Sequence, residues 1–481
     1  MKKFHIGLDF GTYQTKVCIY SIEEDIHTFL KFDNSYFLKS RVALKEDGTL
    51  DYGNTSGSNY IEEFFYFKIA SAEDNEFRLK SNLSSNSIYS FYKEALSAEF
   101  LSTIFISYII FEINDYLKDK YSKIKKASGL LKRLLDRTTD ENIEIDYSIE
   151  LGIPTEWSQE KNYLRRRKFE SILIIASQLS KTFKSKNEFL GKQFSDLIEI
   201  ISEIYTRIKI KTREEFDIKL NELKLRVFPE TAAGLSFIQL TKQLLPGYYA
   251  ILDIGGGSSD ISFFMIDSNN KIKYLASESF LIASNNVFFE FLSDSEKSQD
   301  LEKVQKSILT EIQNGKWENN LDLLNALSSI NRKLNDVIYV LFNKRVFGYD
   351  NYMTNKFKDR RLILYGGGAN LPILNQGKVL IHDNGSPHSL TIPHTYLIKD
   401  LLSEFSSGIN ILPEDNSWKE HFSILAVSLG LSFLKSPDNA EWLDLNNYKS
   451  RNYDESSELM HPFNEGYFFY KVTGKDKGWI K

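Results

Sequence analysis

Apolar positions along this chain follow the two-residue period of strands in some segments and the 3.6-residue period of helices in others. Short apolar or alternating runs predict strands over 4–10, 16–20 and 143–153. Helical spacing predicts one long helix over 91–117 and further helices across 285–345. This mixture of strands and helices predicts an α/β fold.

The Asp47-Gly48 pair predicts a tight turn between two further short strands. Between 143–153 and the middle of the chain, two more apolar helix faces are separated by a Lys/Asn/Ser-rich link. The first face comprises Phe169, Ile172, Leu173, Ala176 and Leu179, and the second comprises Phe194, Leu197, Ile198, Ile201, Tyr205 and Ile208.

Composition indicates a folded protein with room for more than one core. The chain has 481 residues, of which 42% are hydrophobic and 26% charged. A net charge of −5 does not favour nucleic-acid binding, and the basic clusters at 118–126 and 161–168 are interpreted as solvated helix faces. The single cysteine, Cys18, lies in an apolar run, so we expect a buried side chain and no disulfide framework.

Targeting signals do not appear in the sequence. The N-terminal residues lack the apolar core of a leader peptide, and the longest apolar stretches, at 104–111 and 424–434, are shorter than the roughly 20 residues that cross a bilayer. We therefore expect a cytoplasmic protein that does not enter a membrane.

Three glycine-rich turns carry the candidate chemistry. They read GLDFGTYQTK over 7–16, LDIGGGSSD over 252–260 and LILYGGGANLP over 362–372. Glycine lets backbone N–H groups approach an anion, hydroxyls add donors, and an acidic residue that ends an apolar strand can hold a hydrated divalent cation. The first two turns predict a phosphate tail clamped between two domains, and the third predicts backbone against which a base and ribose could lie.

The order of these motifs, DxGTxxT, DxGGGSSD and GGGANxP, resembles the phosphate 1, phosphate 2 and adenosine motifs of the actin-like ATPase superfamily. Within it, the chain is most similar to the nucleotide-binding domain of the 70 kDa heat-shock chaperones, without their substrate-binding domain. Four further stretches resemble that family, at 97–101, 149–154, 228–235 and 425–431, so the likeness spans roughly residues 4 to 434.

The resemblance implies an actin-like ATPase fold, in which ribonuclease H-like duplicated lobes flank a nucleotide cleft. Lobe I would cover 1–245, with a small subdomain at about 34–95 and an extra helical segment at about 180–225. Lobe II would cover 246–395, with an inserted helical subdomain at about 285–350. The residues 396–435 would return to lobe I, and 436–481 would form a tail, with a hairpin indicated around Gly474. The extra segment either pads lobe I or offers a docking surface for a partner.

The resemblance also implies ATP or ADP and Mg²⁺ as cofactors. Asp9 and Asp253 would hold magnesium through water, Glu230 would orient the attacking water, and Lys68 would face the γ-phosphate. Taken by itself, Lys68 is equally an exposed lysine after an apolar run. The nucleotide would be held by Gly11, Thr12, Tyr13, Thr15, Gly255, Gly256, Gly257, Ser258, Ser259, Gly366, Gly367, Gly368, Ala369, Asn370, Glu302 and Lys306.

The chain departs from the chaperone pattern in places. Residues 283–286 read ASNN instead of a Gly-Gly-x-Asp turn, and Gln305 replaces an expected basic residue, which predicts a differently held adenine. About 46 residues follow the closing helix, too few for the chaperones' β-sandwich and helical lid.

We therefore expect a slowly ATP-hydrolysing molecular switch that acts on a protein partner or self-associates. Two alternatives remain open at this point, an actin-like filament-forming ATPase and a catalytically silent nucleotide-binding scaffold. A sugar-kinase-type activity is least favoured, because Glu230 in its Pro-Glu-Thr-Ala-Ala setting matches the hydrolytic branch.

Overall fold

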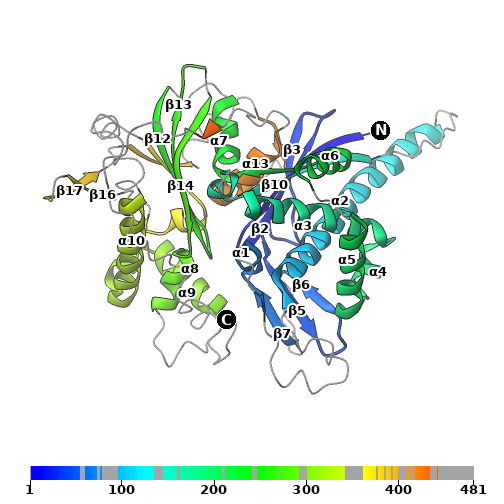
Figure 1. The fold of residues 1–481 in the computed structure, drawn as a ribbon, viewed down its shortest axis with the longest axis horizontal. Helices are drawn as coiled ribbons and strands as arrows, with labels where there is room; N and C mark the ends of the chain where they lie inside the picture. The colour runs from blue at the N-terminus through cyan, green and yellow to red at the C-terminus, as the bar shows by residue number, and fades with distance from the viewer. Residues whose placement is uncertain are drawn as a thin grey trace.

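The computed structural model describes most of the chain and shows two halves side by side (Figure 1). The described residues are 2–54, 60–72, 76–77, 96–134, 145–159, 163–208, 212–240, 246–269, 271–291, 301–341, 361–374, 378–383, 386–391, 394–398, 409–412, 416–433 and 441–442. The first half is built on the sheet that contains the N-terminal strand, and the second half on the sheet that follows residue 246. The structure is mixed α/β, as the sequence predicts.

The first sheet has seven strands and places the N-terminal strand at its centre. Its order is β11 (Leu225–Pro229), β10 (Ile145–Ile153), β1 (Lys2–Phe10), β2 (Gln14–Ser21), β3 (Ile26–Phe29) and β19 (Ile411–Leu412), with β4 (Leu38–Lys39) paired to β2. β1, β2 and β3 are antiparallel neighbours, while β10 lies parallel to β1 and β11 parallel to β10. β19 is parallel to β3.

The second sheet repeats this plan strand for strand. Its order is β18 (His394–Leu397), β15 (Arg361–Tyr365), β12 (Gly247–Ile254), β13 (Ser259–Ile266), β14 (Ile272–Phe280) and β20 (Glu441–Trp442). β12, β13 and β14 are antiparallel neighbours, β15 and β18 add in parallel, and β20 is parallel to β14. The order and the directions of all six strands match those of the first sheet, so the two halves share one topology.

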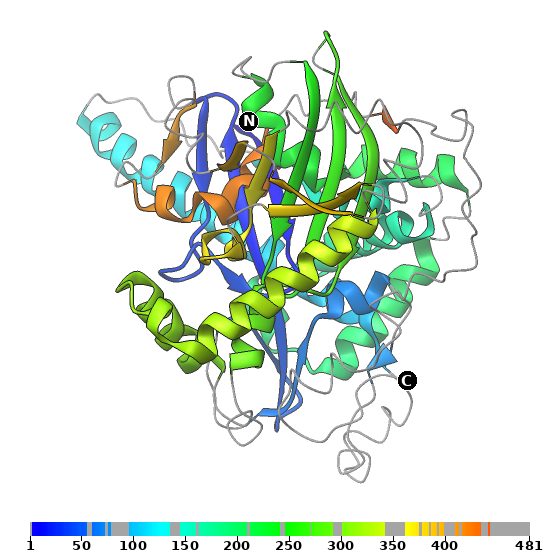
Figure 2. The same ribbon diagram turned by 90° about the vertical axis from the view of Figure 1, so that its left-hand side faces the viewer.

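Smaller elements are inserted into each half. The first half adds a three-stranded sheet, β6 (Leu50–Tyr52), β5 (Arg41–Lys45) and β7 (Tyr60–Phe65), the short helix α1 (Phe67–Ala72) and the two-stranded pair β8 (Glu76–Phe77) and β9 (Leu96–Ser97). The second half adds α8 (Ser284–Phe291), α9 (Leu301–Gln313), α10 (Leu321–Leu341) and the hairpin β16 (Lys378–Asp383) and β17 (Ser386–Thr391). Figure 2 shows α10 lying diagonally across the outer side of the second half.

The helical part of the first half comprises α2 (Ala98–Leu134), α3 (Tyr163–Thr182), α4 (Lys186–Leu190), α5 (Phe194–Ile208) and α6 (Arg213–Leu223). The extra segment predicted at about 180–225 is therefore helical, and α6 begins with a capping box between Thr212 and Glu215. Residues 98–120 of α2 are long and apolar enough to cross a membrane, but 67% of the most apolar window is buried, which is typical of a core helix.

Two helices, α7 (Glu230–Leu240) and α13 (Phe422–Leu431), cross between the sheets (Figure 1). The two helices contact each other at Gly430 of α13, where an added Cβ would lie 1.6 Å from the Ala233 carbonyl oxygen of α7. α13 also lies against β1, because a Cβ on Gly7 would come 2.2 Å from the Ser428 carbonyl oxygen. These glycines let backbones approach more closely than any side chain allows.

Buried apolar side chains among the described residues form one cluster in each half and a third that joins them. The third cluster includes Cys18 of the first sheet, Ile251 of the second sheet, and Ala233 and Leu429 of the crossing helices. Cys18 is fully buried, as expected from the sequence. The shared cluster fixes how the two sheets face each other.

Most predicted elements appear with shifted ends. The strand predicted over 4–10 is β1 and the one over 143–153 is β10, whereas the helix predicted over 91–117 begins at Ala98 and continues to Leu134 as α2. The Asp47-Gly48 turn joins β5 and β6. The indicated hairpin around Gly474 lies outside the described residues.

Candidate functional site

The first two glycine-rich turns, separated by about 240 residues, are in direct contact. Each joins the first two strands of its sheet. The Thr12 and Ser258 hydroxyls lie 2.9 Å apart, and a Cβ on Gly256 would come 2.8 Å from the Tyr13 ring. A Cβ on Gly257 would come 2.7 Å from the Tyr66 ring. The glycines are needed here because side chains of the first half, Thr12 and Tyr13 of the first turn and Tyr66, occupy the space that their own side chains would fill.

An aspartate ends the first strand of each sheet, next to the turn. In the first sheet Asp9 pairs across the hairpin with Lys16, whose Nζ lies 2.9 Å from Asp9 Oδ2. In the second sheet Asp253 pairs across the hairpin with Asp260. The two aspartates therefore hold equivalent backbone positions but face opposite charges.

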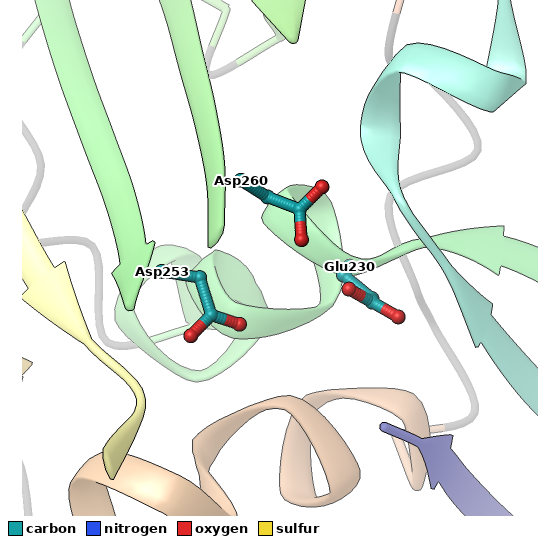
Figure 3. A group of neighbouring side chains, drawn as sticks. All are labelled: Glu230, Asp253 and Asp260. Atoms are coloured by element: carbon teal, nitrogen blue, oxygen red, sulfur yellow. The ribbon is translucent and has the colours of Figure 1, made fainter. Parts of the chain in front are cut away.

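Glu230, Asp253 and Asp260 form an acidic cluster at the first turn of α7 and the ends of β12 and β13 (Figure 3). One carboxylate oxygen from each lies within 4.8 Å of the others. Burial, followed by the neighbouring Asp260 and Glu230 carboxylates, raises the pKa of Asp253 well above its usual range. Burial and Glu230 likewise raise the pKa of Asp260 to about 7, although Ser279 donates a hydrogen bond to it.

Asp253 also carries a buried oxygen, Oδ1, that has no hydrogen-bond partner among the described residues. Carboxylate oxygens grouped in this way are ligands that hard divalent cations such as Mg²⁺ prefer. The cluster therefore fits a divalent cation, which would relieve both the unpartnered oxygen and the repulsion between the carboxylates.

Lys68 and Glu230 form a buried ion pair with Nζ and Oε1 2.9 Å apart. Lys68 is 3% exposed, so the interpretation as an exposed lysine is wrong. Burial by itself would lower the pKa of Lys68, but the Glu230 and Asp9 carboxylates outweigh it and hold that pKa above its usual value. Burial raises the pKa of Glu230, and Lys68 counters this effect only in part.

Local backbone geometry places Lys68 at the cluster. Tyr66 adopts φ 59° between β7 and α1, a left-handed conformation that turns the chain sharply. The first turn of α1 then points Lys68 at Glu230, which begins α7 immediately after β11.

The third glycine-rich turn supports Asp253 from the side. Gly366 has φ 85°, and a Cβ there would lie 2.1 Å from Asp253 Oδ1. Its N–H donates to the Ser423 carbonyl of α13 over 2.7 Å. The following residues form the 3₁₀ turn η7 (Gly367–Asn370), in which Gly368 packs on Ile254 and Ala369 is fully buried.

Other residues predicted to bind nucleotide lie apart from the cluster. The Thr15 hydroxyl is fully buried 2.9 Å from the Ser40 hydroxyl, which donates to the Gly11 carbonyl, so Thr15 braces the first turn from inside. Ser259 is also fully buried. Lys306 is exposed on α9. Glu302 lies on the same helix, but its side chain is outside the described part of the structure.

Tyr13 joins a polar chain that reaches α9. Its hydroxyl donates to Gln305 Oε1 over 3.4 Å, and Gln305 Nε2 donates to Asn285 Oδ1 over 3.0 Å. The ASNN stretch also holds the second turn, because the Ser284 and Asn285 N–H groups donate to the carbonyls of Gly255 and Gly256. Gln305 thus links α9 to the first half, whereas the ASNN stretch holds the second turn within the second half.

Lys16 and Asp260 are the site residues that sequence reasoning missed. Both lie within the motifs, but their importance comes from hairpin register, which places Lys16 opposite Asp9 and Asp260 opposite Asp253. A short turn after each aspartate was the available signal, since turn length sets which residues face each other.

A cavity of about 520 Å³ lies next to Pro229, the residue before Glu230. Both halves line it, the first through α3, α6 and β11 and the second through Tyr274 and Trp442. Arg166, Glu170, Asp217 and Arg226 give it a mixed charge. Its position makes it sensitive to any movement between the two sheets.

No protein-family model matches the chain, and no curated protein matches its sequence.

Proposed function

We propose that this protein is an actin-like ATPase of the heat-shock-chaperone type, a slow ATP-hydrolysing switch whose two lobes respond to nucleotide and act on a protein partner. The observation that carries this proposal is the repeated sheet plan, with an aspartate and a glycine-rich turn at the same place in both copies and the two turns facing each other. An arrangement of this kind suits an elongated polyphosphate and its metal, held between two bodies.

Each half contributes its own groups to the proposed reaction. Asp9 and Asp253 would hold Mg²⁺ through water, and the metal, when bound, would neutralise phosphate oxygens. Glu230, fixed by Lys68, is suited to orient a water and take up its proton, because its raised pKa lies closer to neutral pH than that of an ordinary carboxylate. Thr12, Ser258 and the backbone of both turns offer hydrogen-bond donors for phosphate oxygens.

The contact between the turns explains how binding would act as a switch. The Thr12–Ser258 contact and the packing of Tyr13 on Gly256 occupy the space between the turns. Nucleotide must exchange these contacts for its own, so binding changes the spacing of the halves. The cavity beside Pro229 is lined by both halves and would change with it, which offers a route from nucleotide to partner.

The test is steady-state phosphate release from Mg-ATP by the intact protein, compared with Asp9→Ala and Glu230→Ala. We expect slow turnover that falls about 100-fold or more in both variants, since each removes a charge that positions metal or water. Glu203→Ala, which removes an exposed carboxylate on α5, is the matched control and should leave turnover unchanged.

Equilibrium binding of ATP separates the alternatives. ATP binding without turnover would replace the switch by a nucleotide-binding scaffold, and nucleotide-dependent sedimentation would indicate a filament. Absence of ATP binding at millimolar concentration would overturn the proposal.

A further inference from the structure

Lys16 occupies, in the first half, the position that Asp260 occupies in the second. Both residues stand opposite the strand-end aspartate in the same hairpin register. Because the backbone plan is the same, the difference in charge at this position is a property of the side chains. In the first half the strand-end aspartate is paired with a lysine, whereas in the second half it faces another acid.

The Lys16 ammonium is largely buried beside Asp9 and the first turn. Its side chain is 12% exposed and that of Asp9 is 7% exposed, with 2.9 Å between Nζ and Oδ2. Nζ also lies against the first turn, 3.2 Å from where a Cβ on Gly11 would be. Its positive charge also acts on Glu230 and Asp253, so Lys16 compensates charge on these two acids as well as on Asp9.

Carboxyl groups outnumber ammonium groups around the two turns, among the described residues. Four carboxylates, those of Asp9, Glu230, Asp253 and Asp260, face two ammonium groups, those of Lys16 and Lys68. Glu156, whose charge also acts on Asp260, has Arg165 at 3.9 Å. Both ammonium groups lie 2.9 Å from their carboxylates, but the Lys16 side chain is 12% exposed and that of Lys68 is 4% exposed. Lys16 is therefore the ammonium nearer to solvent and to an arriving anion.

We propose that Lys16 is a tethered counter-ion that competes with the divalent metal for Asp9, so that metal binds tightly only when polyphosphate draws the ammonium away. This inference rests on the proposed function, because it assumes that metal and nucleotide enter this cleft together. A metal at Asp9 would lie close to the Lys16 ammonium, which is 2.9 Å from Asp9 Oδ2, and two cations that share one carboxylate repel each other. An anion that binds the released ammonium would remove the competition, which couples metal affinity to nucleotide.

The test measures Mn²⁺ affinity of the nucleotide-free protein from the EPR signal of free Mn²⁺. Lys16→Met keeps the stem but removes the charge, and we expect it to bind Mn²⁺ about tenfold more tightly than the parent. Lys16→Arg retains the charge and should remain within about twofold of the parent. With ADP present, the difference in Mn²⁺ affinity between Lys16→Met and the parent should become smaller, because nucleotide phosphates then bind the Lys16 ammonium of the parent.

The double variant Asp9→Asn/Lys16→Met shows whether the effect acts through Asp9. With Asp9 neutral, removing the Lys16 charge should tighten Mn²⁺ binding much less than it does in the parent background. Thermal unfolding followed by circular dichroism confirms that each variant is folded before its affinity is compared. If Lys16→Met does not fold, Lys16→Gln replaces it.

Unchanged or weaker Mn²⁺ binding in the folded Lys16→Met variant would overturn the inference, whatever the ATPase result. Tighter Mn²⁺ binding together with no ATP binding in the parent would leave Lys16 as a competitor of metal and overturn the proposed function instead. The two failures are therefore distinguishable.

Discussion

The ends of the two central hairpins have the same backbone register, but the residue opposite the strand-end aspartate is a lysine in one and an aspartate in the other. In the first sheet Asp9 pairs with Lys16 at 2.9 Å, and in the second sheet Asp253 faces Asp260 and has one oxygen without a hydrogen-bond partner among the described residues. At the first end the aspartate is paired with a lysine, while at the second end burial, followed by the neighbouring carboxylates, raises the pKa of both carboxyls. The repeated fold thus supplies two equivalent positions. The side chain opposite each aspartate then decides whether that aspartate is already paired with a cation, as in the first sheet, or faces another acid, as in the second.

The turns themselves are supported in different ways. The first is braced within its own half, by the Ser40 hydroxyl on the Gly11 carbonyl. The second is held by N–H groups at the start of α8, from Ser284 and Asn285. Movement of the inserted helices in the second half would therefore act on the second turn through its backbone, whereas it reaches the first turn only through the Tyr13–Gln305 hydrogen bond.

The largest expected effect on stability comes from disrupting the helix crossing that joins the two halves. Gly430→Ala would place a Cβ 1.6 Å from the Ala233 carbonyl oxygen, so α7 and α13 could no longer cross as they do. We expect a loss of about 3 kcal/mol in the free energy of unfolding, measured with urea, since the clash is with backbone and not with a flexible side chain.

Gly191→Ala is the matched control for that substitution. Gly191 follows α4 with φ −79°, and an added Cβ would meet nothing closer than 3.4 Å. Its free energy of unfolding should change by less than about 1 kcal/mol. Equal losses in the two variants would show that the crossing does not hold the halves together.

Asp260→Asn should make the second hairpin end resemble the first. The pKa of Asp260 is raised from 3.8 to about 7 in the folded state, so between these values the folded protein holds a proton that the unfolded chain has lost. Stability therefore falls as pH rises from about 4 to 7. Removing the charge should flatten this fall and stabilise the protein on the order of 2 kcal/mol at pH 8.

Thermal unfolding of the parent and Asp260→Asn across pH 4.5 to 8 measures how stability depends on pH in each. Lys16→Met should change this dependence in the opposite direction. Loss of the Lys16 ammonium leaves its acidic neighbours less compensated, so the decline with rising pH should steepen. If the thermal stability of the parent and of Asp260→Asn depended on pH in the same way, the charge of Asp260 would not distinguish the two hairpin ends.

The smallest expected effect concerns the hydroxyl contact between the turns. Thr12→Val and Ser258→Ala each remove one side of the 2.9 Å contact, and a double-mutant cycle should give a coupling of about 0.5–1 kcal/mol in the free energy of unfolding. Thr206→Val removes a hydroxyl that bonds within α5, and its effect should add independently to that of Ser258→Ala. Additivity in the Thr12 cycle itself would mean that the contact carries no energy.

Periodicity predicted the elements more reliably than their ends. β1 and β10 follow from alternation, because one strand period places each side chain on a known face. The long helix α2 begins seven residues later than predicted, at Ala98 instead of residue 91. The short strands β3 and β19, in contrast, have little sequence signal and are specified by the strands beside them.

The sequence by itself determined the glycine-rich turns, the strand-end aspartates Asp9 and Asp253, and the mixed α/β class, because these depend on local backbone freedom and on side-chain period. Only the tertiary structure decided that Lys68 is buried against Glu230, that Thr15 faces Ser40, and that the cross-strand partners differ in charge. These relations join residues far apart in the chain or fixed by register. Packing between distant segments sets the Lys68–Glu230 and Thr15–Ser40 contacts, whereas hairpin register sets the cross-strand pairs.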